Sequence, residues 1–440
     1  MAPNLLGSTA IFLAEATTTG QEDSTTTTLR KTATTTLPQI STDSTTTTSY
    51  SKPSTSSSSN NTSTPVVQRK YRPDYEWKIV WRNVIAFLYL HISSLYGLYL
   101  MFTVARGYTN LWAIFYAYLA GMGITAGAHR LWAHRAYKAK WPLRLILCML
   151  QTMAFQNHIY EWVRDHRVHH KFTDTDADPH NANRGFFFSH IGWLMVKKHK
   201  DVVTKGKTVD MSDLENDPII IWQKRTYLVI MPLLCFFFPA WVPYYFWNED
   251  PYVAWYVAAI TRYTLSLNGT WLVNSAAHIW GTKPFDKSIS PTDNVKVAVF
   301  AFGEGWHNYH HVFPWDYKAA ELGNYRTNFT TAFIDMFAKI GWAYDLKTVP
   351  VSMVLKRLNR TGDGTHINHG KQIENSETKI ESEAIKENNN NNNNLEAKVQ
   401  HYLNHNHHLE HQIWGWGDKD MEDADIKDAE IINPSTELVH

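Results

Sequence analysis

Three tight clusters of histidine carry the chemistry that this sequence could perform. They are His129/His134, His166/His169/His170 and His307/His310/His311. Histidine is the commonest metal ligand among side chains. With 22 histidines in 440 residues, one H-x-x-H-H string is expected by chance on the order of once in twenty such chains. This chain has two, so we predict that the clustered histidines bind metal.

The spacing within each cluster suggests how the imidazoles are arranged. His166, His169 and His170 stand at i, i+3 and i+4, which places all three on one face of a helix. The third cluster repeats this arrangement, and two such faces opposed across a bundle could enclose a pair of metal ions. His129 and His134 are five residues apart, about 140° around an ideal α-helix. We therefore expect the helix to end or unwind between them.

Four apolar stretches are long enough to span a bilayer, which needs about 20 residues. They are Val84–Val104, Leu111–Gly127, Tyr227–Trp247 and Tyr252–His278. Short connections join the first two and the last two into helical hairpins. Basic residues concentrate before the first span and in the central loop, which predicts that both termini and this loop face the cytosol. Every histidine cluster falls on that side.

The fourth stretch is about 40 Å long as a helix, some 10 Å more than the hydrocarbon core requires. Its projecting end carries Asn274 and His278 at i and i+4, aimed in one direction. Nine histidines and one amide would then converge. We predict an all-α integral membrane protein: four transmembrane helices in two hairpins, with a cytosolic helical cap that holds a di-metal site.

The ligand types narrow the choice of metal. Cys148 and Cys235 both lie inside apolar runs, so thiolate sites, iron–sulfur clusters and a disulfide framework are excluded. Imidazole suits zinc, copper, iron and nickel, and a structural zinc site is closed by four ligands. Nine or ten donors indicate two ions, and histidine-only ligation with open positions favours iron that handles dioxygen over hydrolytic zinc.

Both ends of the chain differ in composition from the middle. We predict a disordered Thr/Ser-rich tail at 1–68, a folded membrane domain at 69–364 and a disordered polar tail at 365–440, because neither tail can bury much apolar surface. We expect no metal role for the histidines at 401–411 and no secretory signal at the start. A net charge of +1 gives nucleic-acid binding no electrostatic support.

Several strings resemble those of the animal acyl-CoA Δ9 desaturases, the stearoyl-CoA desaturase family. The strings are HRLWAH (129–134), EWVRDHRVHH (161–170), NSAAH (274–278) and GEGWHNYHH (303–311), with TMAFQN (152–157), DPH (178–180), GFFFSHIGW (185–193) and RTGDG (360–364) in addition. The resemblance covers roughly residues 70–365 and leaves out both tails.

This resemblance implies a four-span oxidoreductase of the endoplasmic-reticulum membrane with both termini in the cytosol. It would insert a cis double bond, at Δ9, into C16–C18 fatty acyl-CoA by using O2 and two iron ions. Since the chain contains no His-Pro-Gly-Gly haem motif, electrons would come from a separate cytochrome b5 and its NADH-dependent reductase. Membrane lipid would surround the spans.

The resemblance also assigns residues to roles. The iron ligands would be His129, His134, His166, His169, His170, His278, His307, His310 and His311, with Asn274 acting through water. The bent acyl tunnel would be shaped by Gln156, Trp162 and Thr270 and closed near Ala117, and the CoA head would meet Asn157, Arg164, Asp165, Lys197 and Lys198. Alternatives stay open: an ordinary surface pair for Arg164–Asp165, core packing for Trp162, and close helix packing for Ala117.

Two other functions compete with desaturation. A di-iron membrane hydroxylase of fatty acids or sterols would carry a similar histidine pattern. A histidine-rich metal transporter would place polar ligands midway through the spans. In this chain His91 is the only histidine well inside a predicted span. The resemblance disfavours Δ5 or Δ6 chemistry, since His307 stands where front-end desaturases usually have Gln. A methylene more or less in a tunnel is worth about 1–3 kcal/mol, so chain length and double-bond position are not fixed by the sequence.

Overall fold

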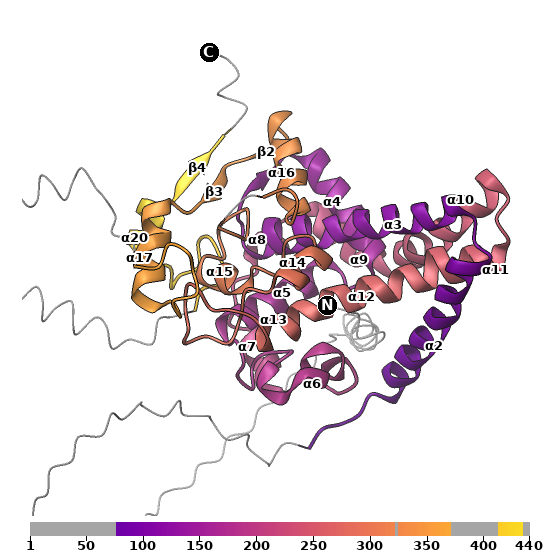
Figure 1. Ribbon diagram of the computed structural model, residues 1–440, viewed down its shortest axis with the longest axis horizontal. Helices are drawn as coiled ribbons and strands as arrows, with labels where there is room; N and C mark the ends of the chain where they lie inside the picture. The colour runs from indigo at the N-terminus through magenta and orange to yellow at the C-terminus, as the bar shows by residue number, and fades with distance from the viewer. Residues whose placement is uncertain (1–75, 322–323, 371–411, 434–440) are drawn as a thin grey trace, which may run out of the picture. The chain divides into compact units, whose positions relative to one another are not determined.

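The computed structural model describes residues 76–321, 324–370 and 412–433. The described residues from Trp77 onward belong to one compact unit, which is mostly helical (Figure 1). Two short antiparallel sheets accompany the helices in this part of the chain: β1 (Lys138–Ala139) with β2 (Ala343–Tyr344), and β3 (Leu346–Thr348) with β4 (Glu430–Ile432).

Three helices among the described residues are long and apolar enough to cross a membrane. The first is α2 (Trp81–Thr103), and the second joins α3 (Gly107–Met122) to a π-helical segment, η1 (Gly123–Ala133). The third joins α9 (Pro218–Pro232), η4 (Leu233–Phe237) and α10 (Phe238–Trp247). Large apolar side chains such as Leu95 and Phe102 are exposed on these helices. An apolar outer face of this kind suits contact with lipid.

The fourth predicted span, Tyr252–His278, differs from the expectation. Here α11 (Pro251–Ala254), η5 (Trp255–Thr261) and α12 (Arg262–Asn274) form a helical rod, and a short α13 (Ala276–Ile279) follows. The rod is not among the three apolar helices of the described chain, since α12 includes Arg262, Asn268 and Asn274. The helix breaks at Ser275, whose hydroxyl donates to the Trp271 carbonyl. Asn274 and His278 therefore do not lie on one continuous helix.

Close helix contacts bring these rods together. Segment η1 packs on α4 (Trp141–Ala154), and a Cβ added at Gly123 would lie 2.1 Å from the backbone nitrogen of Gln151. Only glycine permits this approach. Helices α3 and α12 lie side by side, with η5 against both α2 and α3 (Figure 1). The packing leaves α3 and α12 as two walls of one interior.

The other helices are shorter and surround the histidine-bearing ends. They are α5 (Ile159–Lys171), η2 (Ala182–Arg184), α6 (Phe186–His190), η3 (Gly192–Leu194), α7 (Lys200–Gly206), α8 (Ser212–Glu215), α14 (Val295–Phe300), α15 (His307–Val312), α16 (Phe329–Lys339), α17 (Val351–Thr361) and α20 (Asp423–Asp428).

The predicted disordered tail at 365–440 is wrong for residues 412–433. This segment forms α20 and β4, and β4 pairs with β3 in antiparallel register. Trp414 and Met421 are buried there, which explains why a segment with many acidic residues can still fold. The predicted tail at 1–68 and the histidine-rich stretch at 401–411 lie outside the described residues.

Candidate metal centre

The clustered histidines meet in two adjacent groups. The first group holds His129, His134, His166, His170 and His310, and the second holds His169, His278, His307 and His311. Within each group the candidate ligand atoms all lie within 4.8 Å of one another. The Nε2 atoms of His134 and His166 are 2.8 Å apart, and those of His278 and His307 are 3.0 Å apart. The arrangement is that of two neighbouring sites, each with room for one metal ion.

Local helix geometry explains how the clusters reach the two groups. On α5 and α15 the i, i+3, i+4 spacing places the imidazoles on one face, as predicted. The helix that carries His129 ends at Ala133, before His134, as expected, but its winding from Gly123 onward is π-helical and not α-helical. The His134 backbone N–H donates to the His129 carbonyl at 3.1 Å, an i to i−5 bond of π-helical winding. Five residues then make about one turn, so both rings enter the same group.

Oxygen atoms lie beside the outer nitrogen of four of these histidines. His129 Nδ1 lies 2.7 Å from Glu304 Oε2, and His169 Nδ1 lies 2.9 Å from Asp178 Oδ2. His278 Nδ1 is 3.3 Å from an oxygen of Asp174, and His134 Nδ1 is 2.5 Å from the Trp414 carbonyl oxygen. A partner on Nδ1 fixes the tautomer and the ring orientation, and leaves Nε2 free to bind metal.

These oxygen-bearing residues were not predicted from the sequence as partners of the histidines. Glu304 is also held by Arg130, whose Nη2 lies 2.8 Å from Glu304 Oε1. Burial alone would raise the pKa of the Glu304 carboxyl, but Arg130 and His129 lower it to about 2. In the sequence, Glu304 stands three residues before His307, in the string GEGWHNYHH. This closeness to a histidine cluster is the only signal that could have identified Glu304 as a partner of a ligand.

Electrostatics favour the neutral ring for three histidines of the five-histidine group. Burial, reinforced by the neighbouring imidazoles, lowers the pKa of His166, His170 and His310 well below the usual value. A neutral imidazole is the form that binds a metal. His180 is buried against the His169 ring and near Asp178. It belongs to a third small group with those two residues.

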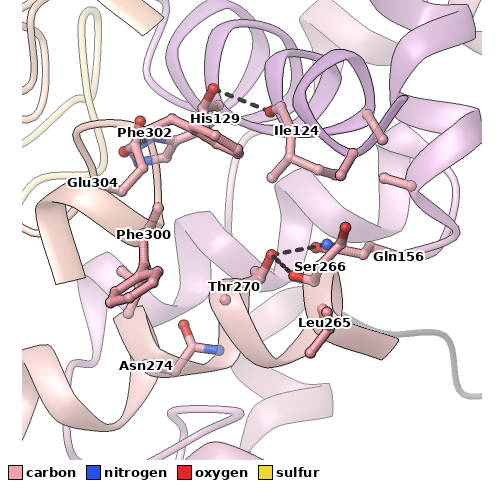
Figure 2. Close-up of a pocket in the computed structure, with 18 of the residues that line it drawn as sticks. Ile124, His129, Gln156, Leu265, Ser266, Thr270, Asn274, Phe300, Phe302 and Glu304 are labelled. Atoms are coloured by element: carbon pink, nitrogen blue, oxygen red, sulfur yellow. Dashed lines mark hydrogen bonds and ion pairs between the residues drawn. The ribbon is translucent and has the colours of Figure 1, made fainter. Parts of the chain in front are cut away.

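A cavity of about 250 Å³ leads to the two groups. Its long walls are α3 with η1 and α12, and Phe300 and Phe302 close one side (Figure 2). The predicted tunnel residues all line it: Ala117, Gln156, Trp162 and Thr270. Gln156 donates from Nε2 to the Thr270 hydroxyl at 2.9 Å (Figure 2). Asn274 lies four residues further along α12 and also lines the cavity (Figure 2).

The residues predicted to meet CoA form an ion-pair network at α5. Asp165 accepts from Arg164 at 3.1 Å and also contacts Lys198 Nζ at 2.5 Å. Asn157 is mostly buried and has a positive φ of 68°. Lys197 is exposed beside Lys198. Asp165 is buried and Arg164 only partly exposed, so the two do not form an ordinary surface pair, and the CoA role of these residues stays a prediction.

Comparison with known proteins identifies the family. The Fatty acid desaturase family model matches residues 107–320. An Acyl-CoA Delta-9 desaturase of Acheta domesticus is 57% identical over 84% of this chain and 90% of its own length. The chain belongs to the acyl-CoA desaturase family.

Other members of the acyl-CoA desaturase family are similar to this chain but differ in regiochemistry. An Acyl-CoA Delta12-desaturase of the same cricket is 50% identical over 85% of this chain and 92% of its own length. The human Stearoyl-CoA desaturase is 52% identical over 69% of this chain and 84% of its own length. The resemblance predicted from the sequence is therefore confirmed, and the protein is an oxidoreductase of this family. The position of the double bond does not follow from family membership.

Proposed function

We propose that this protein inserts a cis double bond at Δ9 of a saturated fatty acyl-CoA. One observation carries the proposal: two groups of clustered imidazoles meet at the end of an apolar cavity. The Δ9 assignment is supported by the 57% identity to a Delta-9 desaturase, compared with 50% to a Delta12 enzyme from the same organism.

The two groups would hold two iron ions, with five histidines at one ion and four at the other. A set of imidazole donors fits divalent iron. When bound, the ions supply the activation of O2 and the removal of two hydrogens from adjacent methylenes. Three carboxylates would orient the ligand histidines by contact with the histidine Nδ1 atoms: Glu304, Asp174 and Asp178. Asn274, which lines the cavity, would act through water.

The cavity would hold the acyl chain with its reactive methylenes beside the histidines. The apolar part of the lining, such as Ile114 and Ala117 on α3 and Leu265 on α12, would keep water away from the acyl chain. The Gln156–Thr270 hydrogen bond joins α12 to the chain just before α5 at the predicted bend. A bent cavity holds the chain in a shape close to that of a cis product, which lowers the entropic part of the barrier.

The CoA head would bind at the network of Asn157, Arg164, Asp165, Lys197 and Lys198. Phosphate groups need cations, and Arg164 offers a planar, bidentate donor. In the structure Arg164 and Lys198 are paired with Asp165 and Glu161. Phosphate binding would compete with these carboxylates for the same cations, so affinity should fall with rising salt.

We further propose that electrons come from cytochrome b5 and its NADH-dependent reductase. The enzyme would lie in the endoplasmic-reticulum membrane, with Pro251–Asn274 as a fourth span that is less apolar than the others. Both termini would face the cytosol, in agreement with the distribution of basic residues around the spans.

The test is expression in a cell that lacks its own desaturase, followed by mapping of double bonds in its lipids. We expect Δ9 monoenes. A Δ11 or Δ12 product would refute the regiochemistry but not the reaction. An alcohol in place of an alkene would refute desaturation in favour of the hydroxylase alternative, since the two products differ in mass.

A further inference from the structure

The C-terminal segment Gln412–Asn433 reaches the metal centre through one histidine. The Trp414 carbonyl oxygen lies 2.5 Å from His134 Nδ1, and the Trp416 backbone N–H donates to the His134 carbonyl at 2.9 Å. The segment therefore contacts both the ring and the backbone of His134. Its ring therefore has a fixed outer partner that comes from 280 residues further along the chain.

This partner differs in kind from those of the other histidines. His129, His169 and His278 have carboxylates beside Nδ1, from Glu304, Asp178 and Asp174 respectively, and all three carboxylates lie within residues 174–304. His134 instead faces a backbone carbonyl, and it is the Nε2 side that meets His166 in the five-histidine group. Without the C-terminal segment, His134 would lose the group that selects its tautomer.

Trp414 is held in place by charged side chains of the helix that carries the second histidine cluster and of the chain beside His134. The guanidinium carbons of Arg167 and Arg135 lie 4.1 and 4.8 Å from the centroid of its ring. Such cation–π contacts are stronger when the cation is desolvated, and Arg167 is fully buried.

Asp418 adds a second attachment. It accepts from the Trp414 backbone N–H at 2.9 Å and pairs with Lys171 Nζ at 2.9 Å. Lys171 directly follows His169 and His170 in α5, so this ion pair ties the segment to the element that supplies ligands to both groups. Asp418 is 4% exposed, which makes the pair less subject to screening by salt than an exposed one.

Gly415 is the residue that allows this close approach. A Cβ at this position would lie 2.5 Å from the His134 carbonyl oxygen and 2.6 Å from its Cα. The backbone φ of 150° also favours glycine. Any larger residue at 415 must push the segment away from His134.

The far end of the segment is anchored separately. Strand β4 pairs with β3, and Met421 packs into an apolar cluster with Tyr309, Phe313 and Trp315 next to α15. The segment can thus stay attached to the protein when the contact at residue 415 is broken. This separation makes a point variant informative.

We propose that Gln412–Asn433 is a positioning segment for the metal centre, in which Trp414 fixes the orientation of His134 and thereby the occupancy of the five-histidine site. The inference rests on the proposed metal-binding function of the histidines. It predicts unequal behaviour of the two sites, because only the five-histidine group contains His134.

The experiment measures iron per chain and the rate of iron transfer to a chelator for full-length, detergent-purified protein. Gly415→Val should lose iron from one site selectively and release it faster than wild type, because removal of an outer partner of a metal ligand typically costs about 10–100-fold in metal affinity. The iron in the four-histidine site should leave at the wild-type rate. Lys419→Ala, at an exposed position in the same segment, is the control and should match wild type.

The possible outcomes distinguish the positioning role of Gln412–Asn433 from the proposed metal centre itself. Iron-loaded wild type with an unchanged Gly415→Val release rate would overturn this inference alone. Loss of both ions together with a collapsed melting temperature would also overturn it, since the segment would then serve only stability. Wild-type protein that binds no iron would overturn the proposed metal centre itself. Asp418→Asn provides a second variant, with the same selective loss expected.

Discussion

The chain length that this enzyme accepts should depend on Ala117. This residue lines the cavity on α3, on the side away from the histidines, together with Ala113 and Ile114. It stands twelve residues before His129, at most about 18 Å along a helix. We predict that the wild type accepts an eighteen-carbon chain at least as well as a sixteen-carbon chain, and that Ala117→Tyr shifts the preference toward the shorter substrate.

The magnitude follows from the apolar surface that the longer chain can bury. Each buried methylene contributes about 0.8 kcal/mol, so a tyrosine ring that displaces the last two methylenes costs about 1.6 kcal/mol. This energy corresponds to roughly a 15-fold change in the ratio of the two products. The double-bond position should not change, because the distance from the CoA site to the histidines is unaltered.

The assay is competition between stearoyl-CoA and palmitoyl-CoA for each variant, with products separated by chain length. Leu111→Tyr provides the matched control, since Leu111 is exposed on α3 and does not line the cavity. An unchanged product ratio in an active Ala117→Tyr enzyme would refute the reasoning. Ala117 would then serve only close helix packing.

Three further predictions concern the ligands, the buried carboxylate and the topology. His166→Ala and His310→Ala should each abolish turnover and lower iron content without unfolding the spans, whereas His405→Ala should change neither quantity; full activity with one ligand removed would contradict the assignment. Glu304→Gln should destabilise the fold by about 3 kcal/mol at pH 7, because the pKa of Glu304 is lowered to about 2. Such stability is present above the unfolded-state pKa and is lost as pH falls toward 2, so the thermal-denaturation difference between variant and wild type should shrink below about pH 4.5. The sequons at Asn60, Asn61, Asn328 and Asn359 should carry no glycan if they face the cytosol. Asn359 is the informative site, since it is exposed while Asn328 is buried and hydrogen-bonded, and a glycosidase-sensitive mass shift at Asn359 would refute the orientation.

The histidine groups could be anticipated because their spacing reports directly on helix geometry. His166, His169 and His170 share a face on any α-helix, and the structure gathers them with the third cluster. The outer partners could not be anticipated in the same way. Asp174, Asp178 and Glu304 are ordinary acidic residues in sequence, and only the folded chain brings them to Nδ1 atoms.

Two features of the structure do not follow from the sequence, each for its own physical reason. The angle assigned to His129 and His134 assumed α-helical winding, whereas η1 is π-helical, and no propensity rule applied to the sequence distinguishes the two. For the segment 412–433, the polar average composition predicts disorder, and the structure shows order. Its order depends instead on a few anchors, Trp414 and Met421 among them, that find buried sites on a surface already built by other residues.

The contact between His134 and Trp414 also has a consequence for the order of events during synthesis. The two residues are 280 positions apart, and ribosomes add about 5–20 residues per second. His134 is therefore made about 15–55 seconds before the carbonyl group that orients it. During this interval Glu304, which comes earlier in the chain, can already have joined His129. The outer contact of His134 can thus form only after Trp414 has been made, and a nascent chain stalled before residue 412 would lack it.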